Sequence, residues 1–324
     1  MGENPGRFNR PKRGRCPRPP DGRTPPGYLG PERGTALKGL AGISRERPVL
    51  IAGPTASGKS ALAMELAARD GRVIVNADAL QVYGCWRILT ARPSAADEAA
   101  LPHALYGHIG RDGAYSVGHW LREVAGFLDR PVVIVGGTGL YFSALTGGLA
   151  EIPAVPEAVR AEGDALRIAD YPAMTAALDA ETAARIDLAN PARVQRAWEV
   201  LRATGRGLAH WQDTTGPALL PFSDAETLVL RPDPAWLNLR IDRRFSAMMA
   251  EGALEEARAE LPHWQPGRPS SRAIGAPELI AALRGEITLE AAVAAACQAS
   301  RQYAKRQRTW FRSRMRDWTA LALP

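Results

Sequence analysis

Eight residues directly after the first apolar run constrain the fold of this chain more than any other feature. Gly53 to Ser60 read Gly-Pro-Thr-Ala-Ser-Gly-Lys-Ser and fit the pattern GxxxxGK[ST]. The apolar residues 49–52 precede them and a helical pattern follows, which is the strand, loop and helix order of a phosphate-binding loop. A chain with this arrangement is expected to fold as a parallel α/β sheet.

Each residue type in this segment, the phosphate loop, suits the binding of a polyphosphate. Glycines let backbone N–H groups turn toward an anion, and the N-terminus of the following helix adds partial positive charge. Lys59 supplies a point charge and Ser60 a hydroxyl for Mg²⁺. The alternative is a glycine-rich turn without a ligand. The expected phosphate-binding residues are Gly53, Pro54, Thr55, Ala56, Ser57, Gly58, Lys59 and Ser60.

Three further apolar runs, residues 73–75, 132–135 and 227–230, have the character of buried parallel strands. Helical patterns lie between them, so the sequence predicts an α/β fold with a P-loop and a doubly wound parallel sheet. Residues 151–215 are Ala-rich, charged and helical in period, which predicts a helical insert domain. The sheet core would then comprise residues 47–150 and 216–324, with a helical C-terminal part.

Composition narrows the class of protein. No apolar run is long enough to cross a membrane and the start has no secretory signal, so we expect a soluble cytoplasmic protein without a membrane partner. The three cysteines are spaced for neither a disulfide framework nor a zinc module. Residues 1–46 are rich in Pro and Arg and are expected to be disordered. An organellar presequence, a tail that grips RNA weakly and a misplaced start codon are alternatives for them.

Positive charge is concentrated in two segments. The net charge is +7, but residues 1–46 carry +6 and residues 301–316 carry +7, which leaves −6 for the rest of the chain. Arg301, Lys305, Arg308, Arg312 and Arg316 would share one helix face, with Tyr303 and Trp310 on the other. A solvated arginine face is the alternative, but seven cations without an acid favour contact with a polyanion.

A carboxylate follows the second predicted strand, not the third. Nucleoside-triphosphate hydrolases usually end a neighbouring strand in Asp, whereas here Val135 leads into Gly136 and Gly137. Because the ends of parallel strands open onto one crevice, Asp78, Thr138 and Lys59 should converge. Asp78 is then placed to take a proton from an acceptor group. A helix N-cap or a metal ligand is the alternative for it.

Taken together, the motifs resemble those of the bacterial tRNA dimethylallyltransferases, also called tRNA isopentenyltransferases, from about Pro48 to Trp318. After the phosphate loop, the resemblance rests on Asp78 to Tyr83, Thr90-Ala91-Arg92-Pro93 with Pro102-His103, Tyr115-Ser116, Val135 to Tyr141, Asn190 to Ala197, Leu239 to Arg244 and Arg301 to Trp310. Ala79 stands where the family usually has Ser, and Leu89 where it has Gly. The segment Ile274-Gly275-Ala276-Pro277-Glu278 departs from the usual IGYxE.

The resemblance implies transfer of a dimethylallyl group from dimethylallyl diphosphate to N6 of the adenine at position 37 of tRNA, with release of diphosphate. The phosphate loop would hold the prenyl diphosphate with Mg²⁺, and the enzyme would be a monomer without an obligate protein partner. Asp78 would be the general base, with Thr138 and Arg240 on the diphosphate side. The implied contacts to the tRNA anticodon stem-loop are Asp78, Ala79, Leu80, Gln81, Thr138, Arg160, Arg193, Arg196, Arg272, Gly275, Lys305, Arg308 and Arg312.

Three rival functions stay open on the sequence. A P-loop kinase would place ATP in the loop and use Asp78 on a hydroxyl acceptor. An enzyme that prenylates a free adenine nucleotide would not need the long cationic face. A non-enzymatic RNA-binding module would leave the phosphate loop without a role. Tyr83 and Tyr141 are the aromatic side chains expected to stack on a base near the crevice.

Overall fold

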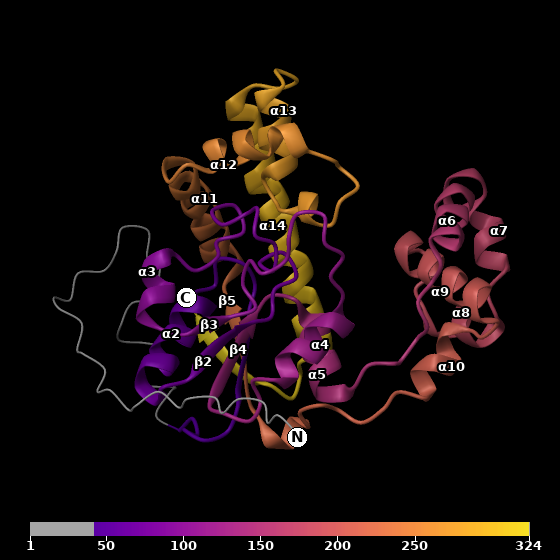
Figure 1. Ribbon diagram of the computed structural model, residues 1–324, viewed down its shortest axis with the longest axis horizontal. Helices are drawn as coiled ribbons and strands as arrows, with labels where there is room; N and C mark the ends of the chain where they lie inside the picture. The colour runs from indigo at the N-terminus through magenta and orange to yellow at the C-terminus, as the bar shows by residue number, and fades with distance from the viewer. Residues whose placement is uncertain (1–41, 324) are drawn as a thin grey trace, which may run out of the picture.

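The computed structural model describes residues 42–323 and contains a six-stranded, fully parallel sheet in the order β3-β2-β4-β1-β5-β6 (Figure 1). The expectation for residues 1–41 lies outside the described residues. Ile51 of β1 pairs with Val135 of β4 on one side and Leu228 of β5 on the other. The strands are β1 (Val49–Ala52), β2 (Val73–Asn76), β3 (His103–Ala104), β4 (Val132–Gly136), β5 (Glu226–Pro232) and β6 (Thr319–Leu323).

Thirteen α-helices and three short 3₁₀ helices accompany the strands within residues 42–323. The α-helices are α2 (Lys59–Asp70), α3 (Ala95–Ala100), α4 (Val117–Ala125), α5 (Gly139–Gly147), α6 (Glu157–Ala169), α7 (Tyr171–Ala176), α8 (Ala180–Arg185), α9 (Pro191–Thr204), α10 (Leu208–Asp213), α11 (Pro234–Ala250), α12 (Ala253–Glu260), α13 (Ala276–Leu283) and α14 (Leu289–Arg314). The 3₁₀ helices are η1 (Phe222–Asp224), η2 (Leu261–His263) and η3 (Ser270–Arg272).

Helices cover both faces of the sheet, so the predicted doubly wound α/β fold is confirmed. Alternate residues of β1 point to opposite faces, as a strand requires. Ile51 packs with Leu62 and Leu66 of α2 on one face. On the other face Leu50 belongs to the cluster that contains Phe142 of α5. Burial on both faces explains why β1, β2 and β4 are apolar up to their last residue.

The predicted strands at residues 49–52, 73–75, 132–135 and 227–230 are all present. The sequence interpretation missed β3 and β6, of which β6 is a strand at the end of the predicted helical C-terminal part. β3 has only two residues, and β6 is an edge strand whose residues are exposed or half-buried. Neither makes the fully apolar run that marks a central strand.

Residues 151–215, predicted as a helical insert, contain α6 to α10. These helices form a lobe set to one side of the sheet and joined to it by two extended segments (Figure 1). Met174, Val194 and Trp198 are buried together in a small core of their own. Asp170, Asp179 and Asn190 accept N-terminal backbone N–H groups of α7, α8 and α9, so side chains cap three of the five helices.

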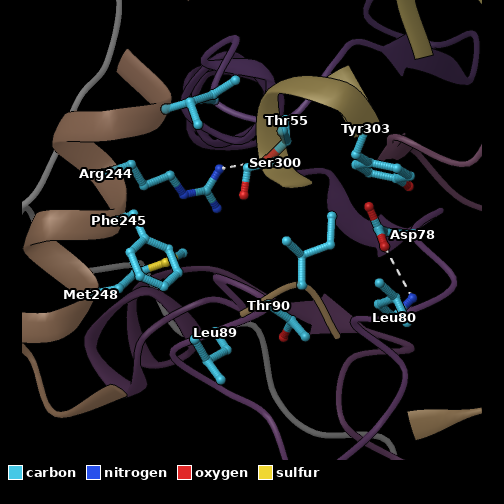
Figure 2. A pocket seen from close by; sticks show the side chains of 13 residues that line it. Thr55, Asp78, Leu80, Leu89, Thr90, Arg244, Phe245, Met248, Ser300 and Tyr303 are labelled. Carbon is cyan, nitrogen blue, oxygen red and sulfur yellow. Dashed lines mark hydrogen bonds between the residues drawn. The ribbon is translucent and has the colours of Figure 1, made fainter. Parts of the chain in front are cut away.

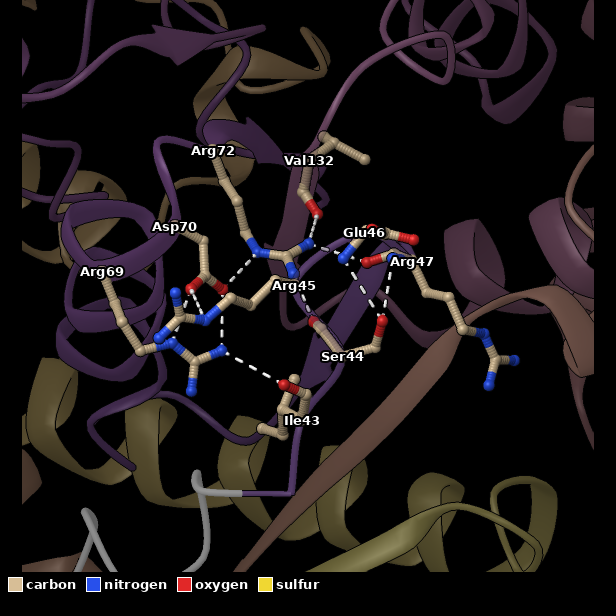
Figure 3. Close-up of polar contacts among 9 residues, drawn as sticks. All are labelled: Ile43, Ser44, Arg45, Glu46, Arg47, Arg69, Asp70, Arg72 and Val132. Atoms are coloured by element: carbon tan, nitrogen blue, oxygen red, sulfur yellow. Dashed lines mark hydrogen bonds and ion pairs between the residues drawn. The ribbon is translucent and has the colours of Figure 1, made fainter.

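The segment before β1 is fixed by Arg72, whose side chain is fully buried (Figure 3). Its guanidinium donates to the carbonyl oxygens of Ser44, Arg47 (2.7 Å) and Val132 (3.2 Å) and to Asp70 (2.9 Å). Arg69 and Arg72 together hold the pKa of the Asp70 carboxyl down to about 2. Disorder was expected up to residue 46, but Ser44 is held by these contacts, so that expectation is wrong for the end of the segment.

Candidate active site

The phosphate loop forms a tight cradle between β1 and α2. Ala56 and Gly58 adopt the left-handed conformation, with φ of 62° and 91°, which turns successive backbone N–H groups toward one side. Gly53 is required here because a Cβ on it would lie 2.7 Å from the Ser57 Oγ atom. The Ser57 hydroxyl is buried and has no hydrogen-bond partner within residues 42–323. A buried hydroxyl without a partner inside a ring of N–H groups fits an anion.

Three cations surround the cradle. Lys59 Nζ lies 3.4 Å from the Pro54 carbonyl oxygen, and burial lowers the pKa of Lys59 to about 8 although Asp78 opposes that shift. Arg240 donates from Nε to the Ala56 carbonyl oxygen (3.0 Å) and stacks on the ring of Trp236. Arg244 donates to Thr55 Oγ1 (3.3 Å). Burial also lowers the pKa of both arginines, which remain charged.

Asp78 is oriented by hydrogen bonds on both sides. The buried Asn76 accepts the Asp78 N–H (2.8 Å) and donates to the Asp78 carbonyl oxygen (2.9 Å). Asp78 Oδ1 accepts the Leu80 N–H (3.0 Å) in a local turn, and no helix starts at this point. The N-cap alternative for Asp78 is therefore wrong. Thr138 Oγ1 accepts the Ala79 N–H (2.9 Å), which ties the β2 loop to the β4 loop.

Asp78 lies where two hollows meet. The first is a cavity of about 620 Å³, open solvent included, lined by the aromatic rings of Tyr303 and Phe245 together with Asp78 and Arg244 (Figure 2). The second is a larger cleft that contains Lys59 and shares Asp78 and Arg244 with the cavity. The predicted convergence of Asp78 with the phosphate loop is thus present, and the Asp78 carboxylate borders both hollows.

Helix α14, near the C-terminus of the chain, packs against two loops of the site. Gln307 is buried, accepts the Thr55 N–H (2.9 Å) and donates to the Gly137 carbonyl oxygen (3.0 Å). It thereby joins the phosphate loop to the loop after β4. A Cβ on Gly137 would lie 2.2 Å from Gln307 Nε2, and one on Gly139 would lie 2.2 Å from the Trp310 ring. The two glycines are therefore needed for close packing against α14.

The cationic face of α14 is smaller than predicted. Arg301 forms an ion pair with Asp242 of α11, and Arg316 lies beyond the last helical residue. Lys305 and Arg312 are exposed, and Arg308 is half-buried with an Nε atom that has no partner in the described part of the chain. Tyr303, expected on the face opposite the cations, lines the cavity beside Asp78 (Figure 2).

Several residues predicted to contact RNA lie outside the cavity and the cleft. Arg160 on α6 and Arg193 and Arg196 on α9 are exposed on the helical lobe, apart from the cavity (Figure 1). Arg272 is exposed, whereas Gly275 is buried against Phe245 and Leu89 and is not placed for direct contact.

The aromatic candidates for base stacking are also buried. Tyr83 and Tyr141 are 2% and 3% exposed, and Tyr141 stacks on Trp120 with ring centroids 4.6 Å apart. Neither ring lines the cavity or the cleft, so the prediction that they stack on a base is wrong. Gln81 lines the cleft, but its amide group donates to the carbonyl oxygens of Thr90 (2.8 Å) and Ala91 (3.0 Å).

Sequence reasoning left out three residues of the site: Arg244, Tyr303 and Gln307. Arg244 is one helical turn after Arg240, so the shared helix face was the signal for it. For Tyr303 and Gln307 no local signal existed, because their position depends on how α14 packs on the sheet.

The described residues hold no group of three or more His, Cys, Asp or Glu side chains that could bind a metal ion, and no described helix has the length and apolar character of a membrane span. The Ser60 side chain is exposed at the first turn of α2 and lines the cleft. A single hydroxyl can hold Mg²⁺ only where phosphate oxygens and water supply the other ligands of the ion. Proteins usually bind Mg²⁺ beside phosphates in this way.

Comparison with known proteins places this geometry in a family. A tRNA dimethylallyltransferase from Cereibacter sphaeroides is 70% identical over 293 residues, which cover 89% of this chain and 93% of the relative. The structure of a tRNA isopentenylpyrophosphate transferase from Bacillus halodurans matches with 30% identity and a TM-score of 0.61, over 86% of this chain and 90% of the other.

A eukaryotic dimethylallyltransferase acting on tRNA has the same fold, with a TM-score of 0.71 and 24% identity over 85% of this chain and 74% of the other. The model of the IPP transferase family matches residues 81–314, a stretch that includes the Arg240 and Arg244 helix, the helical lobe and α14. With a phosphate cradle, an oriented carboxylate and this match over most of its length, the chain belongs to the IPP transferase family.

Proposed function

We propose that this protein transfers a dimethylallyl group from dimethylallyl diphosphate to N6 of the adenine at position 37 of tRNAs, next to the anticodon, and releases diphosphate. The observation that carries the proposal is the position of Asp78 between two hollows, one at the phosphate loop and one lined by Tyr303. Relatives named tRNA dimethylallyltransferase support the same reaction.

The cleft side would hold the diphosphate. As the allylic C–O bond breaks, negative charge accumulates on the leaving diphosphate. Lys59, Arg240 and Arg244 stand at the phosphate loop to stabilise that charge, and the Ser57 hydroxyl is free to donate. Ser60 would hold Mg²⁺ through its hydroxyl, and the bound ion would neutralise part of the diphosphate charge.

The cavity side would hold the adenine. Its N6 amine is a weak nucleophile because the lone pair is delocalised into the ring. Asp78 takes the N6 proton as the new C–N bond forms and the C–O bond breaks, a contribution of about 10²–10⁴-fold in rate. The Tyr303 ring beside Asp78 offers a stacking surface for a base that has left the RNA stack (Figure 2).

Binding of the tRNA would use cations outside the cavity. Lys305, Arg308 and Arg312 follow one another along α14, which also carries Tyr303 at the cavity. The arginines of the helical lobe would contact a second part of the anticodon stem-loop. Phosphate contacts of this kind set the position of the RNA and make its affinity depend on salt.

A kinase is the main competing function, and β4 argues against it. β4 ends at Gly136 without the carboxylate that nucleoside-triphosphate hydrolases place there. The test is to incubate the full chain with an anticodon stem-loop and either labelled dimethylallyl diphosphate or ATP. A mass increase of one dimethylallyl group on the adenosine nucleoside supports the proposal, whereas phosphate transfer from ATP to an acceptor, with unmodified RNA, contradicts it.

The role of Asp78 is tested in the same assay. Asp78→Asn should lower kcat by about 10²–10⁴-fold and leave the affinity for tRNA nearly unchanged. Glu251→Gln is the matched control, because Glu251 is an exposed carboxylate that lines the same cleft. Wild-type turnover in Asp78→Asn would remove Asp78 from the role of base.

A further inference from the structure

A short chain segment, residues 87–91, forms a wall common to both hollows of the site. Leu89 and Thr90 line the cavity, while Ile88, Thr90 and Ala91 line the cleft. The segment has no regular secondary structure of its own, and Ala91 adopts the left-handed conformation with φ 51°. Its shape therefore depends on what holds its backbone.

Glu256 of α12 holds this wall from outside the site. Its Oε1 atom accepts the N–H groups of Arg87 (2.5 Å) and Ile88 (2.9 Å), and its Oε2 atom accepts that of Leu89 (2.9 Å). One carboxylate thus binds three successive backbone N–H groups. Hydrogen bonds to a charged acceptor are stronger than those between neutral groups, so this contact fixes the backbone of residues 87–89.

The opposite end of the wall is held by Gln81, whose amide donates to the carbonyl oxygens of Thr90 and Ala91. The Thr90 hydroxyl donates to the Trp86 carbonyl oxygen (2.5 Å). The N–H groups of residues 87–89 are turned toward Glu256, so they are not donors for a diphosphate. The wall consequently acts through its position and not as a second anion cradle.

We propose that Glu256 is a positioning residue for the transfer reaction, because it fixes the backbone wall against which both substrates meet. This inference rests on the proposed function. Glu256 is half-buried and touches neither hollow, since no lining residue of the cavity or the cleft belongs to α12. Its effect reaches the reaction through Leu89 and Thr90, which face the space beside Asp78 (Figure 2).

The position of the contact predicts which kinetic quantity changes when it is lost. A displaced wall misaligns the adenine amine and the allylic carbon, and a misplacement of about 1 Å costs on the order of 10²-fold in rate. The tRNA phosphates would be bound by α14 and the helical lobe, which Glu256 does not touch. Loss of the Glu256 contact should therefore lower kcat and leave the dissociation constant for tRNA unchanged.

The test compares Glu256→Gln with Glu255→Gln in the full chain. The glutamine is isosteric but points a donor –NH₂ group at one of the N–H groups that Glu256 now accepts, so the bonding of the wall is broken without a cavity. Glu255 is the adjacent, exposed carboxylate on the same helix and is the matched control. The measurements are kcat and KM for dimethylallyl diphosphate with an anticodon stem-loop, tRNA affinity by filter binding, and the unfolding midpoint.

We expect Glu256→Gln to lower kcat by about 10- to 100-fold, with tRNA affinity and the control variant at the wild-type level. All assays are run well below the unfolding midpoint of each variant. A lower midpoint with wild-type kcat would overturn the inference, since Glu256 would then serve only stability. Parallel losses of kcat and tRNA affinity would also overturn it. A wild-type chain that leaves the stem-loop unmodified would instead refute the proposed function itself.

Discussion

Gln307 offers the sharpest test of how α14 is joined to the phosphate loop. Replacement by Leu keeps the approximate size of the side chain and removes both of its hydrogen bonds. The Thr55 N–H and the Gly137 carbonyl oxygen, now paired with Gln307 at 2.9 and 3.0 Å, would lose their partner. Gln307 is 6% exposed, so water cannot easily replace it.

The expected cost follows from that burial. A buried donor or acceptor left without a partner costs about 1–3 kcal/mol, so the two groups together give about 2–6 kcal/mol of lost stability. The new methyl groups would also press on Gly137, whose backbone packs closely against the Gln307 amide. Because the contact joins two loops of the site, we also expect weaker binding of dimethylallyl diphosphate.

Urea unfolding followed by tryptophan fluorescence measures the first effect. The midpoint of Gln307→Leu should fall with little change in the slope, which is the signature of a stability loss without a change in the exposed surface. Gln302→Leu is the control, because Gln302 is exposed on the same helix. If both variants unfold at the wild-type midpoint, the two hydrogen bonds do not hold the loops together and the reasoning is refuted.

Three further predictions concern charge. The pKa of Lys59 is lowered to about 8, so Lys59 loses its charge as the pH rises through 8. The affinity for dimethylallyl diphosphate, measured by calorimetric titration, should then fall by up to about tenfold per pH unit. Lys59→Met should show no such decline. Arg72→Met should destabilise the fold by about 3–5 kcal/mol in urea unfolding, because three carbonyl groups lose their partner and Asp70 loses one of its two arginine donors, while the folded fraction keeps its wild-type turnover. Replacing Arg308 and Arg312 by Ala should weaken tRNA binding, measured by filter binding, and reduce the slope of log affinity against log salt concentration by about 1.5. An unchanged slope would show that this face of α14 is only solvated.

The local sequence pattern predicted the central strands of the sheet and the part of the site that the phosphate loop and Asp78 form. β1, β2, β4 and β5 are apolar runs because both of their faces are buried, and the phosphate loop and Asp78 follow two of those strands directly. β6 was not predictable in this way, since an edge strand with exposed residues has no such pattern.

The other side of the site depends on packing between distant segments. Arg244, Tyr303 and Gln307 reach the phosphate loop and Asp78 from α11 and α14, which follow them by more than a hundred residues. The period of α14 did place its cations on one helix face, but it could not show that Arg301 would pair with Asp242 of α11. The helical period shows which residues share one face of a helix, but the tertiary fold decides what that face packs against.

The two extended segments that join the helical lobe to the sheet have a consequence for how an RNA would be held. Because the lobe has its own core and is joined to the sheet by two extended segments, we expect it to move as a unit relative to the sheet (Figure 1). An RNA that contacts both the lobe arginines and α14 would act as a third attachment and set the angle between the two parts. Rigidity of the complete assembly would then come from the substrate, and it would be lost again when the modified product departs.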